Sequence, residues 1–251
     1  MNTFLTDRER QILDMLVDNY NLTVSRISSD LNVSAVTVRS DLSSMEEKGF
    51  IVRTRGGAFP VFHPEILIGQ KRHIEKKIRI AKAAASIIEE GDTVMINSGT
   101  TSSLVAKYLL GKRNISIVTN STLLLSYARI NPSIKLTLVG GEFRPAQESL
   151  IGPQALRHIE DYHVKYAFVG TDGFSLEKGM TTHLADGAEI IKAMAHQADK
   201  IILIADSSKY GKSGFVKILP LDVVDMIICD TDLDDAHVET LRDTGLEVLL
   251  V

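Results

Sequence analysis

Polar or glycine-rich turns follow five apolar, β-prone runs in the second part of the chain, and their residue types suit an anionic, hydroxylated ligand. Ser98 to Ser102 leads into a stretch with helical spacing, so its backbone N–H groups and hydroxyls can hold a phosphate at a helix N-terminus. Lys209 can complement a phosphate or carboxylate, and Asn120 and Asp172 can bond sugar hydroxyls. The candidate ligand residues of these turns are Ser98, Gly99, Thr100, Thr101, Ser102, Asn120, Gly140, Gly141, Asp172, Gly173 and Lys209.

We expect these turns to follow the strands of a mostly parallel sheet. Helical segments alternate with apolar runs, which predicts βαβ units; the runs are TVMIN, ISIVT, IKLTLV, KYAFVG, KIILIA, MIICD and EVLLV. In such a sheet the turns after the strands meet at one edge, where open α/β sheets bind ligands. The alternative interpretation is a set of ordinary surface turns.

A second group of polar residues, near the N-terminus, suits contact with DNA. Ser34, Thr37, Arg39 and Ser40 belong to the start of a predicted helix whose small polar side chains fit a major groove. Arg39 can reach a guanine or a phosphate, and the sequence leaves both open. Arg53 and Arg55 alternate with other residues on a β-prone run, so we expect both on one face, within reach of phosphates or a minor groove.

The elements around this second group are those of a winged helix-turn-helix, an α+β fold. Thr6 and Glu9 have the spacing of a capping box at the start of a first helix. The next two helices are expected to begin near Thr23 and at Ser34, separated by a break of about three residues. Two short β-prone runs around a Gly-Gly pair at 56–57 then predict a hairpin, the wing.

The charge balance limits how such a domain can bind DNA. The 251-residue chain has a formal net charge of −4, and residues 1–60 hold seven basic and eight acidic residues. Contact with DNA must therefore depend on a local patch, for which Arg39, Arg53 and Arg55 are the candidates. The alternative is a winged helix that binds another protein.

The predicted boundaries are a DNA-binding domain at 1–58, a linker at 59–72 and an α/β sensing domain at 73–251. Pro60, Pro64 and a change toward basic, helical sequence mark the hinge. Any coupling between the two domains is expected to pass through this linker and the helical stretch from Lys71 to Glu90.

Several other classes of protein are not indicated. No stretch approaches the roughly 20 apolar residues that span a bilayer, and no signal-peptide pattern opens the chain, so we expect a cytoplasmic protein without membrane contact. The single cysteine, Cys229, lies in an apolar run and is expected in the core. The histidines lack metal-ligand spacing, and the common nucleotide and hydrolase motifs are missing, so no metal, cofactor or catalytic residue is predicted.

The whole chain resembles the DeoR-type family of bacterial sugar-metabolism repressors. The resemblance rests on VSAVTVRSDLSSMEEKGFIVRTRGGAF, EKKIRIAKAAASII, NSGTTSSLVAKYL, VTNS, VGGEFR, FVGTDG, GMTT and ADSSKYG. It implies a homodimeric or homotetrameric repressor that binds double-stranded operator DNA and weakens there when a phosphorylated sugar binds the second domain. One departure is Ser40, where many relatives carry a second arginine, and this puts one DNA contact in doubt.

The second domain is also similar to ribose-phosphate isomerases and aminosugar-phosphate deaminases, which supplies a rival interpretation as a sugar-phosphate enzyme with an accessory winged helix. Those enzymes place an acidic residue directly after the Gly-x-Asp turn, where this chain has Gly173. Glu189 enters the candidate ligand set only through this resemblance, because a charged residue on a helix usually belongs to a solvated face. The prediction is a regulator and not an enzyme.

Overall fold

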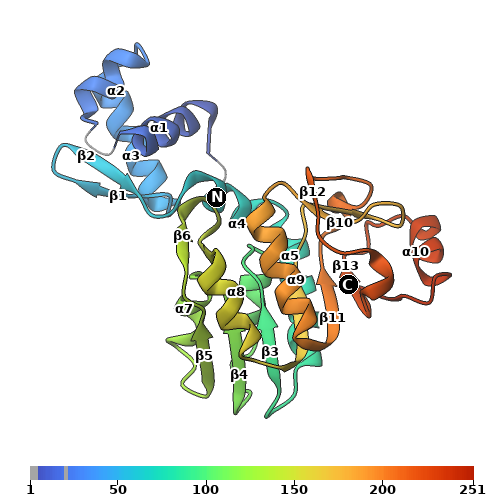
Figure 1. Ribbon diagram of the computed structural model, residues 1–251. Coiled ribbons are helices and arrows are strands. Elements are labelled where there is room, and N and C mark those ends of the chain that lie inside the picture. The colour runs from blue at the N-terminus through green and yellow to red at the C-terminus, as the bar shows by residue number, and fades with distance from the viewer. Residues whose placement is uncertain (1–4, 20–21) are drawn as a thin grey trace. The chain divides into compact units, whose positions relative to one another are not determined.

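The structure is a computed structural model that describes residues 5–19 and 22–251. The chain divides into two compact units between Arg72 and His73, and Figure 1 shows the elements of both. Among the described residues, none of the helices combines the length and apolar character that a bilayer crossing requires.

The first unit is a winged helix-turn-helix, as predicted. Its elements are α1 (Asp7–Asp18), α2 (Val24–Asp30), α3 (Ala35–Glu47), β1 (Ile51–Thr54), β2 (Gly57–Pro60) and α4 (Pro64–Lys71). The expected capping box forms, since Thr6 Oγ1 accepts from the Glu9 N–H at 3.2 Å and Glu9 accepts from the Thr6 N–H at 2.7 Å. The core is built from one apolar stripe on each helix, and its fully buried members are Ile12, Leu13, Leu16, Ile27, Val38 and Met45.

The segment predicted as a linker is structured within this first unit. Residues 59–60 complete the antiparallel hairpin, in which Ile51 lies opposite Pro60, and α4 follows. Leu67 of α4 is buried in the core of the unit. Lys71, at the end of α4, donates to the Lys48 carbonyl at 2.7 Å and lies 3.8 Å above the Phe50 ring. The structured first unit therefore extends to Arg72.

The second unit is a three-layer α/β fold around a parallel seven-stranded sheet. Its strands are β3 (Thr93–Ile96), β4 (Ile115–Thr119), β5 (Ile134–Leu138), β8 (Val164–Val169), β11 (Ala198–Ile204), β13 (Met226–Cys229) and β14 (Glu247–Leu250). These are the seven predicted apolar runs, and every pairing between them is parallel. The spatial order is β14-β13-β11-β8-β3-β4-β5. The strand order therefore reverses between β3 and β8, the topological switch point at which open α/β sheets bind ligands.

Helices cover both faces of this sheet. One face packs on α5 (Ile74–Ile87), α6 (Ser102–Lys107) and α7 (Leu124–Ala128), and the other on α8 (Pro153–Glu160), α9 (Ala185–His196) and α10 (Asp235–Arg242). Strand β3 shows the alternation, since Val94 and Ile96 join the first layer while Met95 joins the second. Figure 1 shows α8 and α9 in front of the sheet.

Short elements extend the edge at which the parallel strands end. A hairpin of β6 (Glu142–Arg144) and β7 (Ser149–Ile151) follows β5, with the 3-10 turn Pro145–Gln147 between its strands. A small sheet joins β9 (Gly173–Ser175), β10 (Gly179–Thr182) and β12 (Val216–Lys217). Two further 3-10 turns, Ser207–Lys209 and Leu221–Val223, complete the unit.

Candidate nucleic-acid interface and ligand site

Hydroxyl caps fix the helix-turn-helix. Thr23 Oγ1 accepts from the Arg26 N–H at the start of α2. At the start of α3, Ser34 Oγ accepts from the Thr37 N–H at 3.0 Å and lies 2.9 Å from Thr37 Oγ1. Asn32, with a φ of 53°, makes the turn between the two helices. The Ser34 and Thr37 hydroxyls, both predicted to contact DNA, thus also stabilise the first turn of α3.

Arg39 and Ser40 are exposed on α3, on the side away from its buried residues. Asp41, the next residue of α3, is buried and accepts two hydrogen bonds from Arg8 of α1, at 2.6 and 2.9 Å. Arg39 and Ser40 therefore remain as the charged and polar candidates for base contact in the middle of α3.

The wing is attached to α3 through Arg53. Its Nη1 donates to Ser43 Oγ at 2.9 Å, and its backbone N–H donates to Glu46 Oε1 at 3.1 Å. Strand β1 ends at Thr54, so Arg55 lies in the two-residue turn with Gly56. The turn, and not strand alternation, therefore positions Arg55, and a shared DNA-facing side for the two arginines stays a prediction. Both arginines are exposed.

Two basic residues of the first unit neutralise buried carboxylates. Arg8 pairs with Asp41, and Lys48 Nζ lies 2.7 Å from the buried Glu9 carboxylate. Burial acts to raise the pKa of Glu9, but hydrogen bonds from Lys48, Ser44 and Thr6 outweigh it and leave the pKa below its usual value. These two cations therefore serve the fold of the unit.

In the second unit, the turns after β3 and β8 meet at the switch point through Asn97. Its Oδ1 accepts from Ser102 Oγ and from the Gly170 N–H, each at 3.0 Å. Ser102 is buried, whereas residues 98–101 are partly exposed. Gly99, with a φ of 158°, gives the tight connection. The predicted phosphate turn thus stands next to the Gly170 to Gly173 turn.

Asn120, after β4, supports the phosphate turn from the other side. It is buried, its Oδ1 accepts from the Ser98 N–H at 2.8 Å, and its Nδ2 donates to the Leu150 carbonyl at 3.2 Å. Because both ends of the amide bond to the protein, Asn120 positions the Ser98 backbone.

Lys77 was not predicted from the sequence as a ligand residue, but it contacts the phosphate turn. It belongs to α5, is only 6% exposed, and its Nζ lies 2.8 Å from Thr100 Oγ1 in the phosphate turn. A signal was present, since Lys77 falls on the stripe that also carries Ile80, Ala81 and Ala84, the buried face of α5. The structure therefore places a buried ammonium beside hydroxyls at the start of α6.

Asp172 and Lys209 face each other across the ends of β8 and β11. Lys209 Nζ lies 3.9 Å from Asp172 Oδ1, and both side chains are partly exposed. The other oxygen of Asp172 accepts from Thr182 Oγ1 at 2.8 Å and from the His183 N–H at 3.0 Å. Two of the predicted ligand residues are therefore brought together at the open edge of the sheet.

Lys76, next to Lys77, ties α5 to the neighbouring turns. Its Nζ contacts Ser207 Oγ and the fully buried Asp230, each at 2.9 Å, and Asp232 at 2.7 Å. Asp230 also accepts from the Ser207 N–H at 2.7 Å. This cluster holds the turn that carries Lys209.

Four of the predicted ligand residues lie apart from this cluster or serve packing. Gly140 and Gly141 follow the edge strand β5, and a Cβ on Gly141 would stand 2.4 Å from the Ile151 carbonyl oxygen. A Cβ on Gly173 would stand 2.3 Å from the Lys212 carbonyl oxygen. Glu189 is exposed on α9 and pairs with Lys192 at 2.8 Å, the solvated helical pair that its sequence position suggests.

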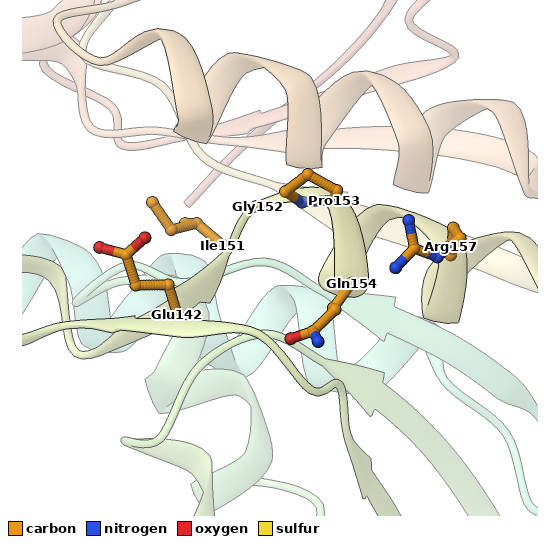
Figure 2. Close-up of a pocket in the computed structure, with 6 residues that line it drawn as sticks. All are labelled: Glu142, Ile151, Gly152, Pro153, Gln154 and Arg157. Atoms are coloured by element: carbon orange, nitrogen blue, oxygen red, sulfur yellow. The ribbon is translucent and has the colours of Figure 1, made fainter.

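A pocket of about 370 Å³ opens between the β6–β7 hairpin and the start of α8 (Figure 2). Its lining residues are Glu142, Ile151, Gly152, Pro153, Gln154 and Arg157. None of them belongs to the predicted ligand set, although Gly141 directly precedes Glu142. In the described part of the chain, no three His, Cys, Asp or Glu side chains gather as a metal site requires.

Comparison with known proteins agrees with both units. Residues 8–60 match the DeoR-like helix-turn-helix domain, and residues 72–231 match the DeoR C terminal sensor domain. A putative aga operon transcriptional repressor of Escherichia coli O157:H7 is 32% identical, over 99% of this chain and 95% of its own length. The HTH-type transcriptional regulator GlpR of Haloferax volcanii is 34% identical, over 97% and 96%. The solved structure of ribose 5-phosphate isomerase A of Methanocaldococcus jannaschii matches 55% of this chain over 55% of its own, with 18% identity and a TM-score of 0.40.

A winged helix-turn-helix followed by an α/β sensor domain defines a transcriptional regulator. The two domain matches together span 213 of the 251 residues, and the relatives match over almost their full length. The chain belongs to the DeoR family, and the resemblance drawn from its motifs is confirmed.

Proposed function

We propose that this regulator represses a carbohydrate-utilisation operon by binding operator DNA through α3 and the wing. The support is the exposed Arg39 and Ser40 on α3, with Arg53 held against the same helix by its bond to Ser43. A relative is named as the repressor of the aga operon, which agrees with control of a single operon. Arg55, at the tip of the wing, is proposed as a phosphate or minor-groove contact.

The proposed effector is a phosphorylated sugar bound where β3, β8 and β11 end. The observation that carries this proposal is the buried Lys77 ammonium 2.8 Å from Thr100 Oγ1, which joins a cation to the hydroxyls and N–H groups of residues 98–102. Asp172 and Lys209 at the neighbouring turns offer a carboxylate and an ammonium to the rest of the ligand.

Helix α5 is the proposed route from effector to DNA. It begins at Ile74, directly after the boundary between the two units, and its first turns carry Lys76 and Lys77. Through these two lysines it contacts the turn after β3 and the turns after β11 and β13. A ligand that recruits Lys77 therefore acts on the first helix after the DNA-binding unit in the sequence.

We assign no catalysis to the sensor domain. An isomerase acid directly after the Gly-x-Asp turn would need a side chain at Gly173, where the Lys212 backbone leaves no room for a Cβ. The family relatives named as regulators agree with a binding role.

The proposed binding of operator DNA is tested by electrophoretic mobility shift on the DNA upstream of the chain's own gene, with the full-length protein at two salt concentrations. Arg39→Ala is expected to weaken specific binding about 10-fold to 100-fold, the range for a lost guanine contact. Arg129→Ala removes the same charge from an exposed position in the second unit and serves as the control. An Arg39→Ala protein with full affinity would overturn the role of Arg39.

The proposed binding of a sugar-phosphate effector is tested in the same assay with a panel of sugar phosphates. One of them is expected to weaken operator binding of the parent chain, and Thr100→Val, which removes the hydroxyl beside Lys77, is expected to need about tenfold more of it. Unchanged DNA binding across the panel would count against a phosphorylated effector.

We also propose that the chain forms a homodimer or homotetramer. Light scattering of the purified chain measures its oligomeric state directly.

A further inference from the structure

Val36 is an apolar side chain held in solvent at the start of α3. It is 73% exposed, the most exposed large apolar residue among those described in the first unit. A β-branched residue at an open helical position gains nothing from burial and has lower helix propensity than alanine. The fold of the unit therefore gives no reason for a valine there.

The position of Val36 places it on the row of α3 that we propose to face DNA. Residues 36, 39, 40 and 43 have the three- and four-residue spacing that puts side chains on one face. Arg39 and Ser40 on this row are exposed, and Ser43 accepts the hydrogen bond from Arg53 of the wing. The opposite face carries Val38 and Leu42 into the core. Val36 is thus the one apolar member of an otherwise polar row.

The neighbouring hydroxyls are already used within the helix. Ser34 Oγ bonds to the Thr37 N–H and lies within hydrogen-bond distance of Thr37 Oγ1. At this end of α3, Val36 is therefore the side chain that projects without an intrahelical role. Its χ1 is largely fixed by the helix, so little rotamer freedom is lost when it packs against a partner.

The chemistry of the major groove supplies one apolar partner. Among the base edges exposed there, only thymine carries a methyl group, and small apolar side chains contact it. We infer that Val36 is a specificity-determining residue that packs against the C5-methyl group of an operator thymine. This inference rests on the proposed binding of operator DNA by α3.

Deoxyuridine tests the contact, because it differs from thymidine only by that methyl group. Duplexes are first selected from a random pool with the full-length parent chain, and each thymine of the selected site is then replaced singly. At one or two positions the replacement is expected to weaken binding about fourfold, the effect of one buried methyl group. Val36→Ala is expected to bind the thymine duplex with a similar loss and to be indifferent to the replacement, which is the signature of a coupled pair.

Val223→Ala is the matched control, since it truncates an exposed valine that lies in the second unit, outside the DNA-binding unit. It is expected to keep the full discrimination between thymine and uracil. If Val36→Ala also keeps it, or if the parent chain shows none, the inference is wrong while DNA binding stands. If no duplex is selected at all, the proposed function fails and this inference fails with it.

Discussion

Replacing Lys76 by methionine removes the cation beside the fully buried carboxylate of Asp230. Breaking a buried ion pair by removing one partner costs about 3–5 kcal/mol. Here Asp230 keeps the hydrogen bonds from Ser207, and the Lys76 side chain is itself 20% exposed, so the lower end of the range applies. We therefore expect Lys76→Met to lower the free energy of unfolding of the second unit by about 3 kcal/mol.

Urea unfolding followed by tyrosine fluorescence measures this loss. The chain has no tryptophan, and five of its six tyrosines lie in the second unit. With a urea slope of about 2 kcal/mol/M, the midpoint should fall by about 1.5 M. Lys192→Met, which breaks the exposed pair with Glu189, is the control and should change stability by less than about 0.5 kcal/mol.

A double-mutant cycle separates the pair from the loss of a lysine. Asp230→Asn in the Lys76→Met background should cost at least about 1 kcal/mol less than it costs alone, because the two side chains are in contact. If Lys76→Met costs no more than the Lys192→Met control, or if the two changes simply add, the cluster does not hold the turn that carries Lys209.

Buried groups and one close backbone approach in the second unit determine its response to acid, to a thiol reagent and to a substitution at Gly173. Burial acts to raise the pKa of Asp230, but hydrogen bonds from Ser207 and Lys76 outweigh it and lower the pKa. The resulting stability is present above the unfolded carboxyl pKa, about 3.9, and is lost as pH falls through the lower folded value, so Asp230→Asn should flatten the acid limb of a stability profile. Burial raises the pKa of the Cys229 thiol to about 12. A thiol reagent at pH 8 should therefore modify the native chain roughly a thousandfold more slowly than the urea-unfolded chain, and equal rates would contradict its burial. Gly173→Asp places a Cβ 2.3 Å from the Lys212 carbonyl oxygen, which should cost about 3 kcal/mol in thermal unfolding, and an unchanged stability would refute the close approach.

The seven strands of the main sheet could be predicted because each is a short, almost continuous apolar run bounded by turn residues. Helix α4 could not, because Pro60 and Pro64 suggest a break. In the structure Pro64 stands at the first position of α4, where a proline has no N–H to lose and its fixed φ suits a helix. Proline therefore ends β2 at position 60 and begins α4 at position 64. The packing of Leu67 into the core, which the sequence does not show, accompanies the second role.

The candidate ligand site could be predicted from the sequence where it depends on chain order, and could not where it depends on contacts between side chains. Turns after parallel strands must meet at one edge, so the neighbouring positions of residues 98–102 and Asp172 follow from the strand pattern. The Lys77 contact with Thr100 joins residues 23 positions apart, and a lysine on a helix usually faces solvent. The sequence shows that residue 120 carries an amide, and only the structure shows that both ends of this amide bond to the protein.

The charge count of the first unit shows why local placement decides DNA binding. Glu9 and Asp41 are buried beside Lys48 and Arg8, so these opposite charges cancel inside the fold. The remaining arginines of α3 and the wing, at 39, 53 and 55, form no ion pair within the described residues and stay exposed. Non-specific DNA binding is almost entirely electrostatic, and a chain with a net charge of −4 attracts bulk DNA weakly. If α3 and the wing bind the operator as proposed, discrimination between operator and bulk DNA rests on the few groups that they present.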